Sequence, residues 1–219
     1  MKQEDTKQKI LAQALELFSA YGYDAVSVGQ IADAVGIKAP SLYNHFPSKQ
    51  AIFDAIMEST AEQYEADTDR IDIHVQNATQ DIPAFIEITE DALFEKVRQI
   101  FVYSLHNKTI RQFRRMMTIE QFRSPELAAQ YTRRYVERVV DYHTGIFRAL
   151  IAEAEIAAED PNALAMMYVA PVLTLIGICD RQPEREQECL EMLQKHVQLF
   201  FRMVHGAGTK VVENNEQIG

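Results

Sequence analysis

Ala32, Gly36 and Leu42 have the residue types and the spacing that are typical of a helix-turn-helix. The alanine is small where two helices would cross, the glycine can adopt the positive φ of a turn, and the leucine would hold the second helix against the first. Such a motif does no covalent chemistry, because it presents the outer face of its second helix to a major groove about 12 Å wide. The same spacing also fits a simple pair of packed helices.

Two short helices are predicted to carry this motif. Ser27 can cap the first helix, and Gln30 stands three residues later, which completes a capping box. Gly36 ends that helix after about two turns. The second helix begins after Lys38, and Pro40 is tolerated in its first turn, where a missing amide hydrogen has no partner to lose. The residues expected on its outer face are Ser41, Tyr43, Asn44 and His45.

Apolar residues recur with helical spacing along the chain, and no stretch alternates with a period of two for long enough to indicate a sheet. The sequence therefore predicts an all-α protein with no internal repeat and with a polar connection at 67–81, for which some helix is left open as an alternative. The expected helices run from 5 or 6 to 21, 27 to 35, 39 to 46, 48 to about 64, 82 to 106, 111 to 123, 125 to about 153, 161 to 179 and 184 to 205.

The charge balance argues against non-specific binding to nucleic acid. The chain has 219 residues, with 22 Lys and Arg against 32 Asp and Glu, and its formal net charge is −10. Its first 60 residues are acidic as well, with five basic and seven acidic side chains. Because phosphate neutralisation needs clustered Lys and Arg, any contact with DNA must be local and geometrically specific.

The cysteines and the apolar segments indicate a reduced, cytoplasmic protein. Cys179 and Cys189 fall at apolar positions of predicted helices, so buried thiols are favoured over a disulfide, and with His196 they lack the spacing of metal ligands. The charged N-terminus has no signal-peptide run. The uncharged stretch 163–179 is shorter than the roughly 20 residues of a membrane span, which favours a buried or dimer-facing helix and no membrane partner.

The run VSVGQIADAVGIKAPSLYNHFPSKQAIFDAI, preceded by ILAQALELFSAYGYDA, closely resembles the DNA-binding domain of the tetracycline-repressor (TetR) family. The resemblance covers about residues 6–57, and the rest of the chain is similar only in length, helix order and all-α character. It implies a dimeric transcription regulator with an N-terminal three-helix helix-turn-helix domain at 1–50. A larger C-terminal helical domain for ligand binding and dimerisation would occupy 51–206, and 207–219 would be a frayed tail. The matching positions are Leu17-Phe18, Gly22, Ile31-Ala32, Val35-Gly36, Leu42-Tyr43, Phe46 and Ser48-Lys49.

The resemblance also implies which residues contact DNA. The hydroxyl of Ser27 and the nearby helix amides would bind a phosphate, and Lys38 would reach a guanine edge or a phosphate. Ala39 or Pro40 would touch a thymine methyl group. The whole implied set is Ser27, Lys38, Ala39, Pro40, Ser41, Tyr43, Asn44, His45 and Lys49.

Three members of this set have plain structural alternatives. Tyr43 fits a half-buried core position, His45 fits stacking on a neighbouring helix, and Lys49 fits a solvated charge at a helix start. The second helix carries no Arg, so readout of the bases would depend on apolar contacts and DNA shape.

The last two predicted helices carry a second pattern. Leu190, Leu193, Val197, Phe200 and Val204 are spaced 3, 4, 3 and 4 residues apart, which resembles a heptad seam. The TetR resemblance places a dimeric four-helix bundle here, and the alternative is an ordinary hairpin within one protomer. The residues expected at the interface are Leu173, Ile176, Leu190, Leu193, Val197, Phe200, Phe201 and Val204.

The middle helices would enclose a ligand cavity, as the resemblance implies. For most of the candidate positions, the alternative is ordinary core packing. His106 and His143 are considered as groups that orient a ligand, and a basic cluster at 111–138 could attract an anionic effector. The candidate ligand-binding residues are Phe101, Leu105, Met117, Phe122, Tyr135, Val139, His143, Phe147, Met167 and Pro171.

No G-x-S-x-G, P-loop or H-E-x-x-H pattern indicates an enzyme, and no cofactor or metal is expected. The expected function is that of a sequence-specific repressor, released from double-stranded operator DNA by a small-molecule effector. The alternatives are a helical small-molecule-binding or scaffold protein without operator binding, and an all-α enzyme.

Overall fold

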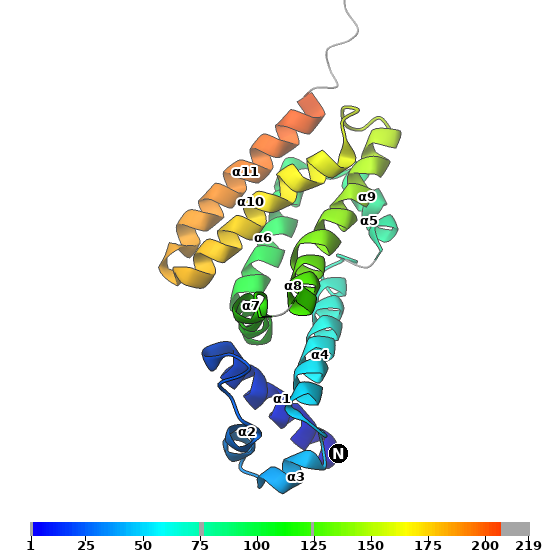
Figure 1. Ribbon diagram of the computed structural model, residues 1–219. Helices are drawn as coiled ribbons and strands as arrows, with labels where there is room; N and C mark the ends of the chain where they lie inside the picture. Colours follow the sequence, from blue (N-terminus) through cyan, green and yellow to red (C-terminus); the bar gives the residue numbers. More distant parts are fainter. Residues whose placement is uncertain (1, 75–76, 124, 207–219) are drawn as a thin grey trace, which may run out of the picture. The chain divides into compact units, whose positions relative to one another are not determined.

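The computed structural model describes residues 2–74, 77–123 and 125–206, and every regular element within them is helical, which confirms the predicted all-α fold (Figure 1). The predicted tail at 207–219 lies outside the described residues. The helices are α1 (Lys2–Tyr21), α2 (Val28–Val35), α3 (Ala39–Tyr43), α4 (Lys49–Asp69), α5 (Ala78–Ile86), α6 (Glu90–His106), α7 (Lys108–Glu120), α8 (Pro125–Thr132), α9 (Arg138–Ala152), α10 (Pro161–Arg181) and α11 (Glu186–Gly206), with a π-helical turn at Arg133–Glu137 and a 3-10 turn at Pro183–Arg185.

Local capping groups set the ends of the N-terminal helices. The Ser27 hydroxyl accepts the amide of Gln30 at 3.2 Å, and the Gln30 side chain accepts the amide of Ser27 at 2.8 Å, so the predicted capping box is confirmed. Gly22 and Gly36 end α1 and α2 with φ angles of 82° and 79°, in the region that favours glycine. The Ser48 hydroxyl caps α4.

Several predicted helix boundaries from α4 onward are wrong. The single helix expected at 82–106 is two helices, because the Thr89 hydroxyl accepts the amide of Ala92 at 3.2 Å and starts a new one, α6. The connection expected at 67–81 includes the start of α5, which the Asn77 side chain caps, as the alternative of some helix in this segment allowed. The π-helical turn interrupts the helix expected at 125–153, and α4 continues past 64 to Asp69.

The chain forms two compact units. The first contains residues 1–70 and 104–135, and the second contains the described residues of 71–103 and 136–219. The boundaries between the units therefore lie just after α4, within α6 and within the π-helical turn. The domain boundaries expected at 50/51 and 206/207 stay predictions.

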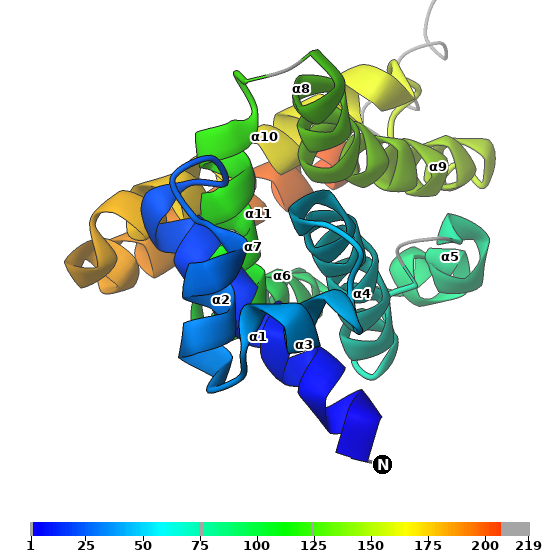
Figure 2. The same cartoon turned by 60° about the horizontal axis from the view of Figure 1, so that its bottom comes forward.

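The first unit has a core built mainly from α1 and the helices around it. Figure 2 shows α2 and α3 beside α1. Ile10 and Phe18 of α1 are fully buried together with Leu42 of α3 and Ile52 of α4. Met116 and Met117 of α7 belong to the same core, and α7 packs against α1 and α4.

The second unit is formed by α5, most of α6, and α9 to α11. In Figure 1, α10 and α11 run side by side and α9 lies along α10. Gly145 of α9 lets α5 approach closely, because a Cβ atom added there would lie 3.2 Å from the Cβ of Ala78. In the described part of the chain, α10 is the one helix long and apolar enough to cross a membrane by length and composition. It packs against α9 and α11 and buries Leu164, Tyr168 and Leu175, as a core helix does.

Candidate functional site

The helix-turn-helix geometry expected from the sequence is present in residues 28–43. Ala32 and Leu42 are both fully buried between the two helices. Gly36 turns the chain, and the amide of Ile37 donates to the carbonyl oxygen of Ala32 at 3.0 Å. This packing fixes α3 on α2 and leaves the outer face of α3 free of core contacts.

Most of the predicted DNA-contacting side chains are exposed. Tyr43 is 52% exposed and does not belong to the core cluster of this unit. Ala39 and His45 are partly buried. The exposed members of the set are Ser27, Lys38, Pro40, Ser41, Tyr43 and Asn44.

His45 has one ring nitrogen that points into the protein. Its Nδ1 is buried and has no hydrogen-bond partner in the part of the chain that the structure describes. Because Nδ1 is buried, only Nε2 of this ring can donate to a group outside the protein.

Lys49 has a different environment from the one expected. Its Nζ donates to the carbonyl oxygens of Tyr23 and Val26, both at 2.8 Å. It also lies 4.2 Å from the centre of the Tyr23 ring. The ammonium therefore holds the loop between α1 and α2, and the alternative of a merely solvated charge does not apply.

The buried carboxylate of Glu120 also binds the loop between α1 and α2. Glu120, at the end of α7, is 1% exposed and accepts the amide of Tyr23 at 2.8 Å. Arg123 donates to the other oxygen of Glu120 at 2.8 Å and forms an ion pair with Asp24 at 2.6 Å. Sequence reasoning missed Glu120, because a partner 97 residues away leaves no local signal.

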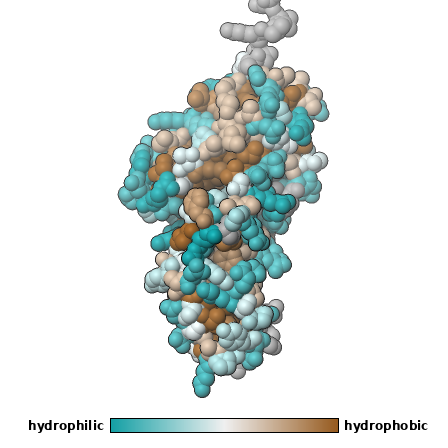
Figure 3. Space-filling view, in the orientation of Figure 1, coloured by the Kyte–Doolittle hydropathy of each residue, from teal (hydrophilic) through white to brown (hydrophobic). Residues whose placement is uncertain are grey.

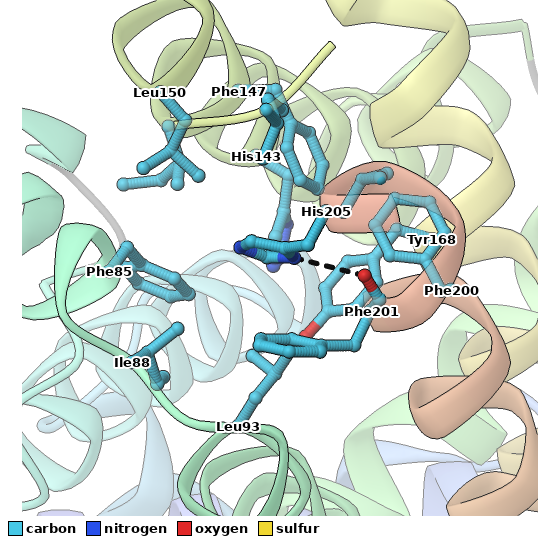
Figure 4. A pocket seen from close by; sticks show the side chains of 13 residues that line it. Phe85, Ile88, Leu93, His143, Phe147, Leu150, Tyr168, Phe200, Phe201 and His205 are labelled. Atoms are coloured by element: carbon cyan, nitrogen blue, oxygen red, sulfur yellow. Dashed lines mark hydrogen bonds between the residues drawn. The ribbon is translucent and has the colours of Figure 1, made fainter. Parts of the chain in front are cut away.

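The second unit contains a small apolar cavity of about 20 Å³ (Figure 4). Such a volume suits about one water molecule, whereas sites for drug-sized ligands have roughly 300–1,000 Å³. Figure 4 shows the imidazoles of His143 and His205 near its middle. The residues that line it are Phe85, Ile88, Leu93, His143, Ile146, Phe147, Leu150, Ile156, Tyr168, Phe200, Phe201, Val204 and His205.

Two of the predicted ligand-binding residues line this cavity, and the rest of the set stays a prediction. Only His143 and Phe147 line the cavity. Phe122 is 89% exposed and Met167 is 50% exposed, so neither points into a core. Leu105, Met117, Phe122 and Tyr135 belong to the first compact unit, whereas Phe101, Val139, His143, Phe147, Met167 and Pro171 belong to the second.

The cavity lining is mostly apolar. Its lining includes no Asp, Glu, Lys or Arg. Burial lowers the pKa of His143 to about 4, and the hydrogen bond from its Nδ1 to the carbonyl oxygen of Val139 at 2.8 Å offsets only part of that effect. Burial also raises the pKa of the Tyr168 hydroxyl. A charged ligand would therefore find no partner here, and an apolar one with a hydrogen-bonding group would fit the chemistry.

A buried acidic network lies elsewhere in the second unit. Asp81 accepts hydrogen bonds from the Tyr142 hydroxyl and from the amide of His74, the latter at 2.8 Å, and its other oxygen meets the His74 imidazole. Burial alone would raise the pKa of Asp81, but these hydrogen bonds outweigh it and lower the pKa. The network ties α5 to α9 and to the chain before α5.

The basic cluster at 111–138 is partly engaged inside the first unit. Arg114 is buried, and its Nη1 donates to the carbonyl oxygen of Ser104 at 3.0 Å. The guanidinium of Arg134 lies 4.6 Å from the centre of the Phe113 ring. Arg114 and Arg134 therefore stabilise packing.

The predicted heptad seam faces inward. Leu193, Val197, Phe200 and Val204 are all buried within one protomer, as the hairpin alternative requires. Leu190, Phe201 and Leu173 are partly buried, and Ile176 is buried. Figure 3 shows hydrophobic surface over the region of α10. The large apolar side chains that α10 and α11 expose are Met166, Met167, Met192, Leu199 and Met203.

Cys179 and Cys189 are free and buried, and burial raises the pKa of the Cys179 thiol to about 12. In the described ranges, no group of three or more His, Cys, Asp and Glu side chains is placed to hold a metal ion.

Residues 10–56 match a family model described as "Bacterial regulatory proteins, tetR family". Two curated relatives match over a short part of the chain. The Staphylococcus aureus (strain Newman) biofilm operon icaADBC negative transcriptional regulator IcaR is 48% identical over 48 residues, which are 22% of this chain and 26% of that protein. The Escherichia coli (strain K12) transcriptional repressor ComR is 36% identical over 56 residues, 26% of this chain and 27% of that one. These matches span about a quarter of each relative.

Solved structures are similar over nearly the whole chain. A TetR-family regulator from Mesorhizobium loti has a TM-score of 0.69 at 18% identity and covers 94% of this chain and 99% of its own. SmeT, the repressor of the multidrug efflux pump SmeDEF of Stenotrophomonas maltophilia, has a TM-score of 0.59 at 21% identity. The similarity covers 92% of this chain and 89% of the SmeT chain. At these identities the likeness shows the fold.

Proposed function

The chain belongs to the TetR family of transcription regulators, and from this premise we propose that it is a repressor that binds operator DNA and is released by a small molecule. Membership identifies a regulator and not an enzyme. The observation that carries the proposal is the exposed outer face of α3, held by buried Ala32 and Leu42 inside the segment that matches the family. The relatives IcaR and ComR, which are named a negative regulator and a repressor, support repression.

We propose that α3 enters the major groove with its N-terminal end. Lys38 and Ser41 would read base edges, and Ala39 and Pro40 would contact thymine methyl groups. Ser27, Tyr43, Asn44 and the Nε2 of His45 would bind phosphates, which position the protein without reading sequence. Lys49 is left out of this set, because its ammonium already donates to two backbone carbonyls.

A homodimer would place two recognition helices on successive major grooves, about 34–36 Å apart. Because most of the predicted seam is buried within one protomer, we propose that the exposed apolar side chains of α10 and α11 form the interface instead. Those residues are Met166, Met167, Met192, Leu199 and Met203.

The effector would bind in the second unit at the mostly apolar cavity beside His143. At about 20 Å³ the cavity must enlarge before it can hold such a molecule, so binding would require side chains such as Phe147 and Phe200 to move. An uncharged, mostly apolar compound with one hydrogen-bonding group suits this lining best. A protein acting on operator DNA would work in the cytoplasm.

A mobility-shift assay with the DNA that flanks the protein's own gene tests the proposal. We expect a shifted complex that survives excess unrelated DNA and is lost at high salt. Binding to every fragment with equal strength, or to none, would contradict it.

A further inference from the structure

The α1–α2 loop (residues 22–27) leads directly to the N-cap of α2. Both backbone groups of Tyr23 in this loop are bound by side chains from other helices. Its amide donates to Glu120 of α7, and its carbonyl oxygen accepts from Lys49 of α4, each at 2.8 Å. Its ring lies against Phe18 and Phe53, with 5.3 Å between ring centres in both pairs. The loop is thus fixed from two sides.

Lys49 reaches the loop at a second point, close to the proposed phosphate site. Its other hydrogen bond goes to the carbonyl oxygen of Val26, the residue before the N-cap Ser27. With two of its three donors on carbonyls and its charge over the Tyr23 ring, the ammonium is directed into the protein.

Glu120 is a costly residue to bury so close to a DNA-binding unit. A carboxylate loses hydration on burial and would repel phosphates, so its retention needs compensating hydrogen bonds. The Tyr23 amide and Arg123 supply them, and Arg123 also pairs with Asp24 of the loop.

We propose that Lys49 and Glu120 are positioning residues for DNA binding. They hold the α1–α2 loop so that Ser27 and the first turn of α2 are oriented toward a phosphate, and neither residue touches DNA. This role rests on the proposed function of the protein. Through Glu120, α7 also contacts the α1–α2 loop directly.

Two variants of Glu120 distinguish the positioning role from a purely electrostatic effect of its negative charge on DNA binding. If charge alone mattered, Glu120→Ala and Glu120→Gln would both tighten DNA binding, because each removes a negative charge. In the positioning role, Glu120→Ala leaves the partly buried Tyr23 amide without its acceptor and should weaken binding roughly tenfold. Glu120→Gln keeps an acceptor oxygen and should bind within about threefold of the wild type.

For Lys49 the salt dependence of binding is decisive. Lys49→Met should weaken binding to a duplex from the upstream region of its own gene about tenfold, with an unchanged slope of log affinity against log salt concentration. A lost phosphate contact would instead reduce that slope by about 0.9 for each protomer. Lys9→Met controls for the loss of one positive charge, since Lys9 is exposed and paired with Asp5.

Hydrogen exchange in the DNA-free protein tests the same role without DNA. The amides of residues 23–30 should exchange faster in Glu120→Ala and Lys49→Met, while those in the middle of α1 stay protected. Should Lys49→Met fold poorly, Lys49→Gln, which keeps a donor, replaces it. Unchanged exchange in the loop, or a reduced salt slope, would overturn the proposal. If the wild type bound no DNA, the proposed function would be wrong. Hydrogen exchange of the loop amides would still show whether Glu120 and Lys49 hold the loop.

Discussion

The Nδ1 of His143 lies 2.8 Å from the carbonyl oxygen of Val139, one turn earlier in α9. Burial keeps this imidazole neutral in the folded protein and lowers its pKa to about 4. In an unfolded chain the pKa of histidine is about 6.5. Between these values the unfolded chain binds a proton that the folded protein does not, so the stability contributed by neutral His143 is present above pH 6.5 and is lost as the pH falls.

We therefore expect the free energy of unfolding to decrease between about pH 6.5 and pH 4, with roughly 3 kcal/mol at most arising from His143. Below pH 4 this residue adds no further loss. Urea unfolding of the wild type and of His143→Leu at pH 7, 5.5 and 4.5 measures the difference. An identical pH dependence in both proteins would contradict the burial of a neutral imidazole.

The Asp81 network supplies a second stability prediction. Tyr142→Phe removes the hydroxyl that donates to a buried carboxylate and should cost about 1–3 kcal/mol. Tyr21→Phe is the control, because Tyr21 is exposed. Denaturant unfolding at pH 7 compares the two, and equal stabilities would show that the Tyr142 hydrogen bond contributes nothing.

The helix-turn-helix could be predicted from sequence because its signals are local. Ser27 and Gln30 are three residues apart and satisfy each other, and Gly36 stands at a turn that needs a positive φ. The apolar spacing continues across the break between α5 and α6, so the sequence predicts one continuous helix at 82–106. Its capping residue Thr89 looks like any exposed polar residue within such a pattern.

Long-range relationships could not be predicted in this way. The spacing of Leu193, Val197 and Phe200 indicates that one face of α11 is buried, but not whether the same chain or a partner buries it. The pairing of Glu120 with Tyr23 and the cavity lining depend on tertiary packing between distant segments. Aromatic and Met composition alone therefore does not predict which residues line this cavity.

The proposed dimer interface can be tested with matched variants of α11. Leu199→Glu together with Met203→Glu changes two exposed side chains and should give a folded monomer. Leu193→Glu buries a charge in the core of the protomer and should unfold it, at several kcal/mol. Analytical ultracentrifugation and circular dichroism distinguish these results. A dimeric Leu199→Glu, Met203→Glu protein would place the interface elsewhere.

The cavity predicts a change in ligand response. Ile146→Ala enlarges the cavity and should cost about 2–5 kcal/mol, yet toluene should raise its melting temperature more than that of the wild type. Leu164→Ala is the control, since Leu164 is buried in the same unit away from the cavity lining. An equal response of Ile146→Ala and Leu164→Ala to toluene would mean that the cavity is not the binding site.

The outer face of α3 is tested by comparing base-reading with phosphate-binding residues. Tyr43→Phe should weaken binding to all sequences about equally, because a phosphate contact carries no sequence information. Lys38→Ala and Ser41→Ala should instead change the preference among operators by about 1–3 kcal/mol for a base pair. Fluorescence anisotropy with single-base operator variants measures both effects. Equal loss on every sequence for Lys38→Ala would make it a backbone contact.

The most direct test of DNA recognition by α3 is the anisotropy of a labelled duplex from the upstream region of the protein's own gene, titrated with the wild type and with a Lys38→Ala, Ser41→Ala, Tyr43→Phe triple variant. All three side chains are outside the core, so the variant should keep the circular dichroism spectrum of the wild type. We predict that the wild type prefers this duplex to a shuffled one by at least a thousandfold and that the variant loses that preference. A folded variant that binds the duplex as tightly and as selectively as the wild type would contradict recognition through α3.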